Sequence, residues 1–294
     1  MAGAGEMRAL RRRISSVKST QQITRAMELI AASRIARARS MVESARPYAE
    51  MITRVMRDLG AESAVADHPL LAARDPIKAV GIIVISSDRG LAGAYNTNIV
   101  RRAERLMHDE REAGRDTFLY VVGRKAETYF RYREEPMEDG WASMSDKPRY
   151  ADAVTIGNVV TEDYDEGKID RVWVAYTDFR SALNQVPSVA KLLPVDPKAF
   201  AGGTEFPPQF IFEPDPGTIL RRLIPRYVEH RLYAALLESA ASEHASRQRA
   251  MKAATDNAGE IVEDLTREAN RARQGAVTTE ISEIVGGAEA LSGG

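Results

Sequence analysis

Residues 10–56 read LRRRISSVKSTQQITRAMELIAASRIARARSMVESARPYAEMITRVM. Apolar side chains recur in this stretch at alternating steps of four and three residues, the period of about 3.5 that a heptad repeat requires. Eleven of the 14 positions in the series are apolar, and the exceptions are Gln21, Thr24 and Glu28. Neither proline nor glycine interrupts residues 8–46. The pattern predicts one long helix of the coiled-coil type, roughly 70 Å in length at about 1.5 Å per residue.

A second segment with the same period extends from Leu223 to Thr279. Twelve of its 17 seam positions are apolar, and six of these are alanine, which lets two helices approach closely. Because a helix covering about residues 218–285 is not stable as an isolated rod, we expect it to pack antiparallel against the N-terminal helix. It is the longer of the two, so one end should protrude. Pro225 is expected to kink or restart this helix near its beginning.

The middle of the chain has the composition of a globular domain. Sixteen of the 19 aromatic residues lie within 58–217. Apolar runs alternate there with amphipathic stretches, which predicts a partly parallel, doubly wound sheet. The expected strands are 79–86, 117–122, 171–177 and 187–193, the expected helices are 97–113, 124–132 and 151–166, with a loop over 133–150 and an edge strand over 209–213. The fold class is α/β, with a Rossmann-like domain over 58–217 between coiled-coil helices over 1–57 and 218–294.

Charge is distributed unevenly along the chain. The formal net charge of −1 conceals +8 in residues 1–57, −8 in 58–217 and −1 in 218–291.

The absence of cysteine excludes disulfides, thiolate metal sites and cysteine nucleophiles. Neither a signal peptide nor an apolar run of membrane-spanning length is visible, so we expect a soluble or peripherally attached protein.

The loop at 86–93 (SSDRGLAG) is the one candidate nucleotide site, because it follows a strand and precedes a helix. Its spacing matches neither GxGxxG nor GxxxxGK[ST], so a tight turn in which glycines permit unusual backbone angles is the favoured interpretation. The four histidines lack metal-ligand spacing, and His230 and His244 fall on the helical seam, where a register-setting role is favoured. We expect no catalytic residue, metal or cofactor in this chain.

Two further segments suggest partners. The arginines at 11–13 and at 25, 34, 37 and 39 are compatible with nucleic acid, with a solvated helix face or with an acidic protein. Few aromatic residues interleave them, which disfavours single-stranded nucleic acid. The segment 272–288 is rich in small residues and largely uncharged at its tip. If it overhangs the N-terminal helix, it lacks an internal partner and should insert into another protein.

Ordered runs across the whole chain resemble the gamma subunits of F-type ATP synthases. They are 22–28 (QITRAME), 31–34 (AASR), 45–48 (ARPY), 68–70 (HPL), 86–91 (SSDRGL), 164–167 (YDEG), 213–216 (EPDP), 250–258 (AMKAATDNA) and 280–288 (EISEIVGGA).

The resemblance implies a central rotor shaft without a catalytic site of its own. In this family the coiled coil enters a ring of alpha and beta subunits, and the α/β domain lies on the epsilon subunit and the membrane ring of c subunits. Proton flow turns the shaft, which drives the beta subunits through their conformations. The resemblance places the protein peripherally on the cytoplasmic face of the cell membrane, attached only through the complex, and implies no nucleic-acid partner.

Site residues follow from the resemblance by position. Arg273 and Gln274 match the pair that hydrogen-bonds a loop of the catalytic subunit. Met27, Arg25 and Arg34 match a stretch that faces an acidic segment of beta. The tip held in an apolar bearing contains Ile281, Ile284 and Val285. The lack of cysteine excludes the thiol regulation of chloroplast members.

Two other classes make different predictions. A nucleotide-dependent enzyme with helical arms would bind ATP or a dinucleotide as an isolated chain. A nucleic-acid-binding coiled coil would bind DNA with a steep salt dependence.

Overall fold

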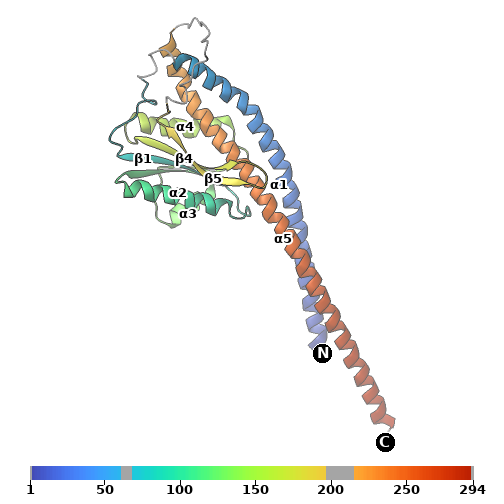
Figure 1. The fold of residues 1–294 in the computed structure, drawn as a ribbon. Helices are drawn as coiled ribbons and strands as arrows, with labels where there is room; N and C mark the ends of the chain where they lie inside the picture. Colours follow the sequence, from blue (N-terminus) through green and yellow to red (C-terminus); the bar gives the residue numbers. More distant parts are fainter. Residues whose placement is uncertain (1, 61–67, 197–214, 293–294) are drawn as a thin grey trace. The chain divides into compact units, whose positions relative to one another are not determined.

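The computed structural model of the chain describes residues 2–60, 68–196 and 215–292 (Figure 1). Five helices and five strands are defined in these ranges. In chain order they are α1 (Ala2–Gly60), β1 (Ala79–Ile85), α2 (Tyr95–Glu112), β2 (Asp116–Val122), α3 (Arg124–Tyr132), β3 (Asp139–Trp141), α4 (Tyr150–Asp165), β4 (Arg171–Phe179), β5 (Gln185–Leu193) and α5 (Pro216–Ser292).

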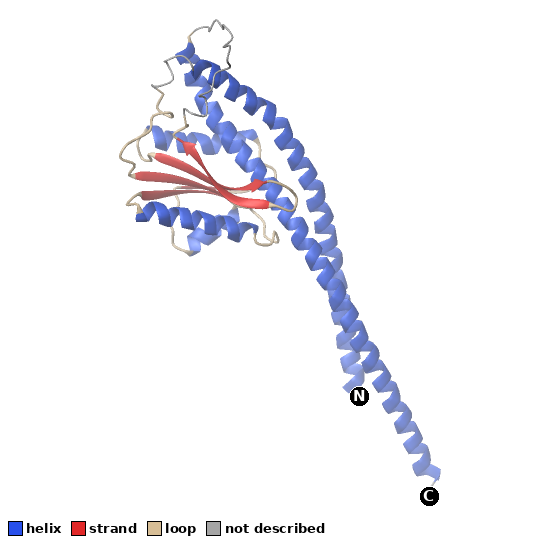
Figure 2. Cartoon of the chain, in the orientation of Figure 1, coloured by secondary structure: helices blue, strands red, loops and turns tan. Residues whose placement is uncertain are grey.

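The strands form one sheet, drawn in red in Figure 2. Their order in the sheet is β3-β2-β1-β4-β5. β1 is parallel to β2 and β4, β2 is parallel to β3, and β5 is antiparallel to β4. The chain moves outward from β1 to β3 and then crosses through α4 to β4 on the other side of β1. This order confirms the predicted partly parallel, doubly wound sheet.

Both faces of the sheet are covered, which explains why β1 is apolar throughout. Val80, Ile82 and Val84 of β1 belong to a core that includes residues of α2 and α3. Ile83 and Ile85 point to the opposite core, which includes residues of α4 and of the long helices α1 and α5. Figure 1 shows α2 and α3 on one face and α4 on the other.

Most predicted elements are present, with specific exceptions. The helix predicted at 124–132 has the same bounds in the structure. The loop predicted over 133–150 was wrong in part, because it contains the three-residue strand β3. A strand this short, hydrogen-bonded only to β2, carries no periodic signal. Pro225 lies inside α5, so the helix does not restart there. The strand predicted at 209–213 lies outside the described residues.

Contacts group the chain into two compact units. We call Met1–Ile30 with Gln248–Gly294 the coiled-coil unit, and Ala31–Arg247 the α/β unit. Each of the two long helices contributes to both units. The sequence-based division at residues 57 and 217 follows the helix ends instead and stays a prediction.

In the coiled-coil unit, α1 and α5 are antiparallel. The Gln21 side-chain amide donates to the Thr255 carbonyl oxygen at 3.3 Å, and the hydroxyls of Thr24 and Thr255 lie 2.8 Å apart. The buried residues of this unit all occupy predicted seam positions, which confirms the heptad interpretation. They are Leu10, Thr24, Met251, Thr255, Ala258 and Leu265.

Within the coiled-coil unit, the C-terminal end of α5 extends beyond the point where α1 begins. The pairing of Gln21 with Thr255 places the beginning of α1, at Ala2, opposite residues near 274. Residues 273–286 of α5 are correspondingly exposed. This overhang agrees with the expectation of a protruding end. Throughout the described parts of the chain, the helices lack the combination of length and apolarity that crossing a membrane requires.

In the α/β unit the same seam is buried against the domain. Ala31, Ile35, Ala38, Ile52 and Met56 of α1 are at most 7% exposed. Near the beginning of α5, the ring of His230 stacks on the ring of Tyr48 of α1, and the two ring centroids are 4.2 Å apart. The long helices are therefore part of the core of this unit.

Candidate functional site

Doubly wound sheets bind ligands beyond the carboxyl ends of their strands, at the point where the strand order reverses. In this sheet that point lies between β1 and β4. Here α5 lies over the end of β4, because the Ser242 hydroxyl donates to the Thr177 carbonyl oxygen at 3.1 Å and the Thr177 N–H donates to the Ser239 hydroxyl at 3.3 Å. Both serines are at most 2% exposed. A helix of the chain itself occupies the usual ligand position.

The loop that follows β1 is held by hydrogen bonds to neighbouring loops. The Asp88 carboxylate accepts the N–H groups of Ser143 at 2.8 Å and Ser145 at 3.1 Å. Burial by itself would raise the pKa of Asp88, but these bonds and a longer one from the Arg124 N–H outweigh burial and hold the pKa below its usual value. Asp88 is therefore an ionised anchor that joins the loops after β1, β2 and β3.

The N–H groups at the start of the same loop are already paired within the chain. The N–H of Ser87 donates to the Asn96 side chain at 3.0 Å, and the N–H of Asp88 donates to the Ser145 hydroxyl at 2.8 Å. Gly93 adopts a positive φ of 57°, as expected for a tight turn, and Leu91 adopts 61°. The structure supports the interpretation of 86–93 as a structural turn.

Arg247 of α5 closes this end of the sheet. Its Nη2 atom donates to the carbonyl oxygens of Arg89 and Gly90, both at 3.2 Å, and lies 2.7 Å from Glu243 Oε1. Arg247 is 7% exposed and Glu243 is 1% exposed. The guanidinium thus links a carboxylate on its own helix to the backbone of a loop more than 150 residues earlier.

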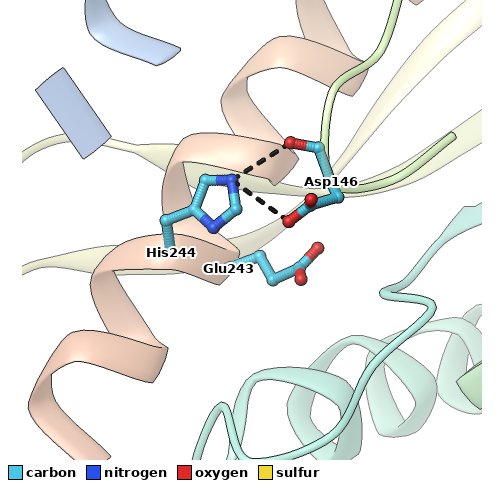
Figure 3. Close-up of side chains that lie close together, drawn as sticks. All are labelled: Asp146, Glu243 and His244. Carbon is cyan, nitrogen blue, oxygen red and sulfur yellow. Dashed lines mark hydrogen bonds and ion pairs between the residues drawn. The ribbon is translucent and has the colours of Figure 1, made fainter. Parts of the chain in front are cut away.

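Asp146, Glu243 and His244 form a cluster beside this ion pair (Figure 3). Glu243 and His244 project from α5 toward Asp146, which lies in the loop after β3. Asp146 also forms an ion pair with Arg34 of α1. Burial raises the pKa of Glu243 to about 7, although the adjacent Arg247 opposes the shift.

His244 is neutral in this setting. Its Nε2 atom lies 3.1 Å from the Asp146 carbonyl oxygen and 3.8 Å from the Asp146 carboxylate. Burial lowers the pKa of His244, and the contacts with Asp146 only partly offset it. The predicted register-setting role of this histidine stays a prediction, but its polar partner belongs to the α/β unit.

The three side chains of the cluster each offer a ligand atom within 4.8 Å of the others, a spacing compatible with a metal ion. However, each carboxylate is already paired with a guanidinium, Asp146 with Arg34 and Glu243 with Arg247. Because these charges cancel, a divalent cation would introduce uncompensated positive charge beside two arginines. We treat the cluster as an ion-pair network. The adjoining cavity, of about 110 Å³, is below the roughly 300 Å³ of a small ligand pocket.

The residues predicted at the tip lie on exposed surface of the coiled-coil unit. Arg273 and Gln274 are exposed. Ile281, Ile284 and Val285 are 55%, 66% and 52% exposed. Their spacing of three and four residues puts these three apolar side chains on one face of α5. Val277, 49% exposed and one turn earlier, extends the same stripe and was missed.

The predicted N-terminal residues are divided between the units. Arg25 is exposed and Met27 is half-buried in the coiled-coil unit. Arg34 belongs to the α/β unit, where it pairs with Asp146. Nothing in the described residues therefore joins Arg34 to the other two as one site.

Comparison with known proteins gives a consistent result along the whole chain. The family described as ATP synthase matches residues 6–291. The ATP synthase gamma chain of Frankia casuarinae is 49% identical over 301 residues, covering 99% of both chains. That of Mycolicibacterium smegmatis is 47% identical over 306 residues, again covering 99% of both. The chain belongs to the ATP synthase gamma chain family.

Solved structures agree with this gamma-chain assignment. A chain in the central stalk and c-ring structure of the Tetrahymena thermophila mitochondrial ATP synthase is 28% identical, with a TM-score of 0.62 over 79% of this chain and 99% of that one. A chain in the rotor of the Euglena gracilis mitochondrial enzyme shares the fold at 17% identity, with a TM-score of 0.66 over 93% of this chain and 99% of that one.

The polar cluster at the end of the sheet was not predicted from the sequence, although one of its members, His244, was singled out as a seam position. Asp146 and Glu243 are 97 positions apart and belong to no spaced motif. The available signal was that residues 242–249 (SEHASRQR) are charged or polar except for Ala245, and that two neighbouring seam positions, His244 and Gln248, fall within them. The turn at 86–93 was noticed, but its contact with Arg247 was not.

Proposed function

We propose that this chain is the central rotor shaft of an F-type ATP synthase. It couples proton-driven rotation of the c ring to conformational cycling of the catalytic beta subunits and carries no catalytic site of its own. The observation that supports this most strongly is identity near one half, over the full length, with proteins named ATP synthase gamma chain. The occupied end of the sheet, where an enzyme of this fold would bind its ligand, is in accord with a non-catalytic role.

The shaft acts through differential binding. A rotor can drive beta subunits through a sequence of states only if each orientation of the rotor favours a different conformer of each subunit. A single exposed stripe on α5 makes the tip unequal around its axis. Ile281, Ile284 and Val285 would turn in an apolar bearing formed by the alpha and beta subunits, where their burial is favourable.

Polar contacts with beta would supply the part of the interaction that depends on the orientation of the rotor. We assign Arg273 and Gln274 to hydrogen bonds with a loop of beta, since both are exposed on the protruding end of α5. Arg25, with Met27 beside it, would face an acidic segment of beta. Arg34 would do so only by exchanging its present partner Asp146.

The α/β unit would lie outside the catalytic head, against the epsilon subunit and the c ring. Its net negative segment and covered sheet suit a structural platform. The chain would then be a peripheral protein at the cytoplasmic face of the cell membrane, attached through the complex. The predicted partners are alpha, beta, epsilon and c subunits, and no nucleic acid.

Reconstitution tests this function. Mixing the chain with matching alpha and beta subunits should give a stable complex whose ATPase activity exceeds that of alpha and beta alone. A chain truncated after residue 272 is the matched control, because it keeps the α/β unit and loses the protruding end. Failure of the full chain to assemble, or equal activity with and without it, would contradict the proposal.

A further inference from the structure

The turn at 86–93 remains without a role in the proposed function, although it lies at the end of the central strand β1. The contact between the backbone of this turn and α5 suggests a role for the turn. Arg247 donates through Nη2 to the carbonyl oxygens of Arg89 and Gly90 at 3.2 Å, and through Nε to Gly90 at 3.4 Å. These are charge-assisted bonds from a planar fork, which fix direction as well as distance.

Burial makes this contact a strong constraint. Arg247 is 7% exposed and pairs with Glu243, which is 1% exposed, across 2.7 Å. Because the guanidinium is buried, moving it away from Glu243 and the two loop carbonyl oxygens would leave its charge without compensation, which is costly. The guanidinium is therefore held at one position between its helix and the loop.

The apolar packing of α5 at this level is poorly suited to resist sliding or rotation. Between positions 240 and 247, the buried apolar residues of α5 are Ala240, Ala241 and Ala245. Alanine allows close approach but offers no long side chain to interlock, and apolar attraction is non-directional. The other directional contacts of this stretch are those of Ser239 and Ser242 with Thr177 of β4, that of His244 with the Asp146 carbonyl oxygen at 3.1 Å, and a longer one from the Ser246 hydroxyl to Gln185 of β5 at 3.5 Å. Of these contacts, the Arg247 fork is the one that reaches the turn after β1.

The position of Arg247 in the chain adds to the argument. It is the last residue of the α/β unit, so α5 leaves that unit immediately after this contact. A torque carried by α5 would be transferred to or from the domain over the residues before this point. Directional contacts at the exit limit how far the helix can twist relative to the sheet.

We propose that Arg247, held by Glu243, is a positioning residue that pins α5 to the turn after β1 and thereby prevents slip between the α/β unit and the long helix during rotation. This inference rests on the proposed rotor function. It assigns the turn at 86–93 a mechanical role in place of the phosphate-binding role that its position in the sheet suggests.

The test is the ratio of protons pumped to ATP hydrolysed, measured with the complete enzyme in lipid vesicles. R247Q should lower this ratio about threefold or more, because ATP hydrolysis continues while rotation is transmitted incompletely. R247K, which keeps the charge but loses the fork, should fall between wild type and R247Q. The control is R222Q on the same helix, where the arginine is exposed. It should leave the ratio unchanged.

A second variant separates the loss of the loop contact from misfolding caused by an unpaired buried carboxylate. R247Q leaves Glu243 buried without its ion-pair partner, whereas E243Q/R247M removes both charges and still lacks the donors to the loop. The double variant should assemble and show the same reduced ratio as R247Q. A wild-type ratio in the double variant would overturn the proposal. So would a loss of ATPase activity and pumping in equal proportion, because that indicates only a structural contribution.

The experiments distinguish an error in the proposed rotor function from an error in the role of Arg247. If wild-type chain does not assemble with alpha and beta subunits, the rotor assignment is wrong and this inference falls with it. If wild-type chain assembles and pumps but R247Q keeps the wild-type ratio, only the pin is wrong.

Discussion

Glu243 is the residue at which burial and ion pairing oppose each other most directly. Burial disfavours its charged form, the neighbouring Asp146 adds repulsion, and Arg247 and Ser145 stabilise the charge. Tyr95 of α2 also faces it, and burial followed by the repulsion of Glu243 raises the pKa of this phenol. The outcome is a carboxyl group with a pKa of about 7 in the folded chain.

This shift makes a prediction about pH and stability. Because the folded-state pKa of Glu243 is above its usual 4.5, its contribution to stability is complete below pH 4.5 and is lost as the pH rises through about 7. Over that window the loss amounts to about 3 kcal/mol in the free energy of unfolding. E243Q stays neutral, so its stability should decline less between pH 5 and 8 in urea titrations.

The matched control for that experiment is E260Q on the same helix, where Glu260 is exposed. Its pH profile should follow that of the wild type. Parallel profiles for wild type and E243Q would show that Glu243 is ionised throughout, contrary to the burial argument.

Gly123 provides a second test at the scale of one residue. It adopts a φ of 94° between β2 and α3, and a Cβ atom there would lie 2.5 Å from the Ser86 carbonyl oxygen. Gly114 also has a positive φ, 75°, but a Cβ atom there would meet nothing within 4 Å. G123A should destabilise the chain by about 3 kcal/mol or more, and G114A by about 1 kcal/mol, in thermal or urea unfolding. Equal losses would contradict the crowding at Ser86.

At the scale of elements, the pairing of α1 with α5 explains why polar residues interrupt the seam. Thr24, an exception in the apolar series, is 9% exposed, and its hydroxyl meets that of Thr255. Gln21 also bonds across the pair. Because these contacts need particular partners, they favour one register of the two helices over others that would keep apolar residues in contact.

We therefore expect T24V to cost about 1 kcal/mol in the free energy of unfolding, since it leaves the buried Thr255 hydroxyl without this contact. T20V on the same helix is the control, because Thr20 is exposed and bonds only to the Ser16 carbonyl oxygen four residues earlier. The losses in unfolding free energy of T24V and T20V are measured by following helix content with circular dichroism during urea unfolding. Equal effects of the two substitutions would show that the hydroxyl pair does not stabilise the coiled coil.

The elements differ in how far sequence could predict them. Long periodic segments such as α1 and α5 were predictable, because one pattern repeats over many turns. β1 was predictable since both of its faces are buried. β3 was not, because three residues carry no period. The Arg247 contact was not predictable either, since it depends on how α5 crosses a loop that lies far away in the chain, which spacing along the sequence does not encode.

At the scale of the whole molecule, the exposed end of α5 is predicted to act on beta subunits and to contribute little to folding. R273A/Q274A should therefore lower ATPase turnover of the reconstituted complex, while the melting temperature of the isolated chain stays within about 2 °C of wild type. R271A, an exposed arginine nearby on α5, is the control and should keep full turnover. If melting falls sharply in the double variant, these residues are structural and the assigned contact with beta is wrong.

The uneven charge of the chain also acquires a meaning at this scale. The +8 of residues 1–57 is carried by α1, whose arginines are exposed at many positions, for example Arg11, Arg25 and Arg37. Arg34 already has an internal partner in Asp146. We propose that exposed arginines such as Arg11, Arg25 and Arg37 face an acidic surface of the catalytic subunits, which would attract the shaft without fixing it at one angle.

Rotation of the chain inside the catalytic head tests the central claim most directly. A probe attached to the exposed surface of the α/β unit, in a complex whose beta subunits are fixed to a support, should turn in one direction when ATP is added and stop when ATP is removed. A complex that hydrolyses ATP at full rate while the probe stays still would contradict the rotor function.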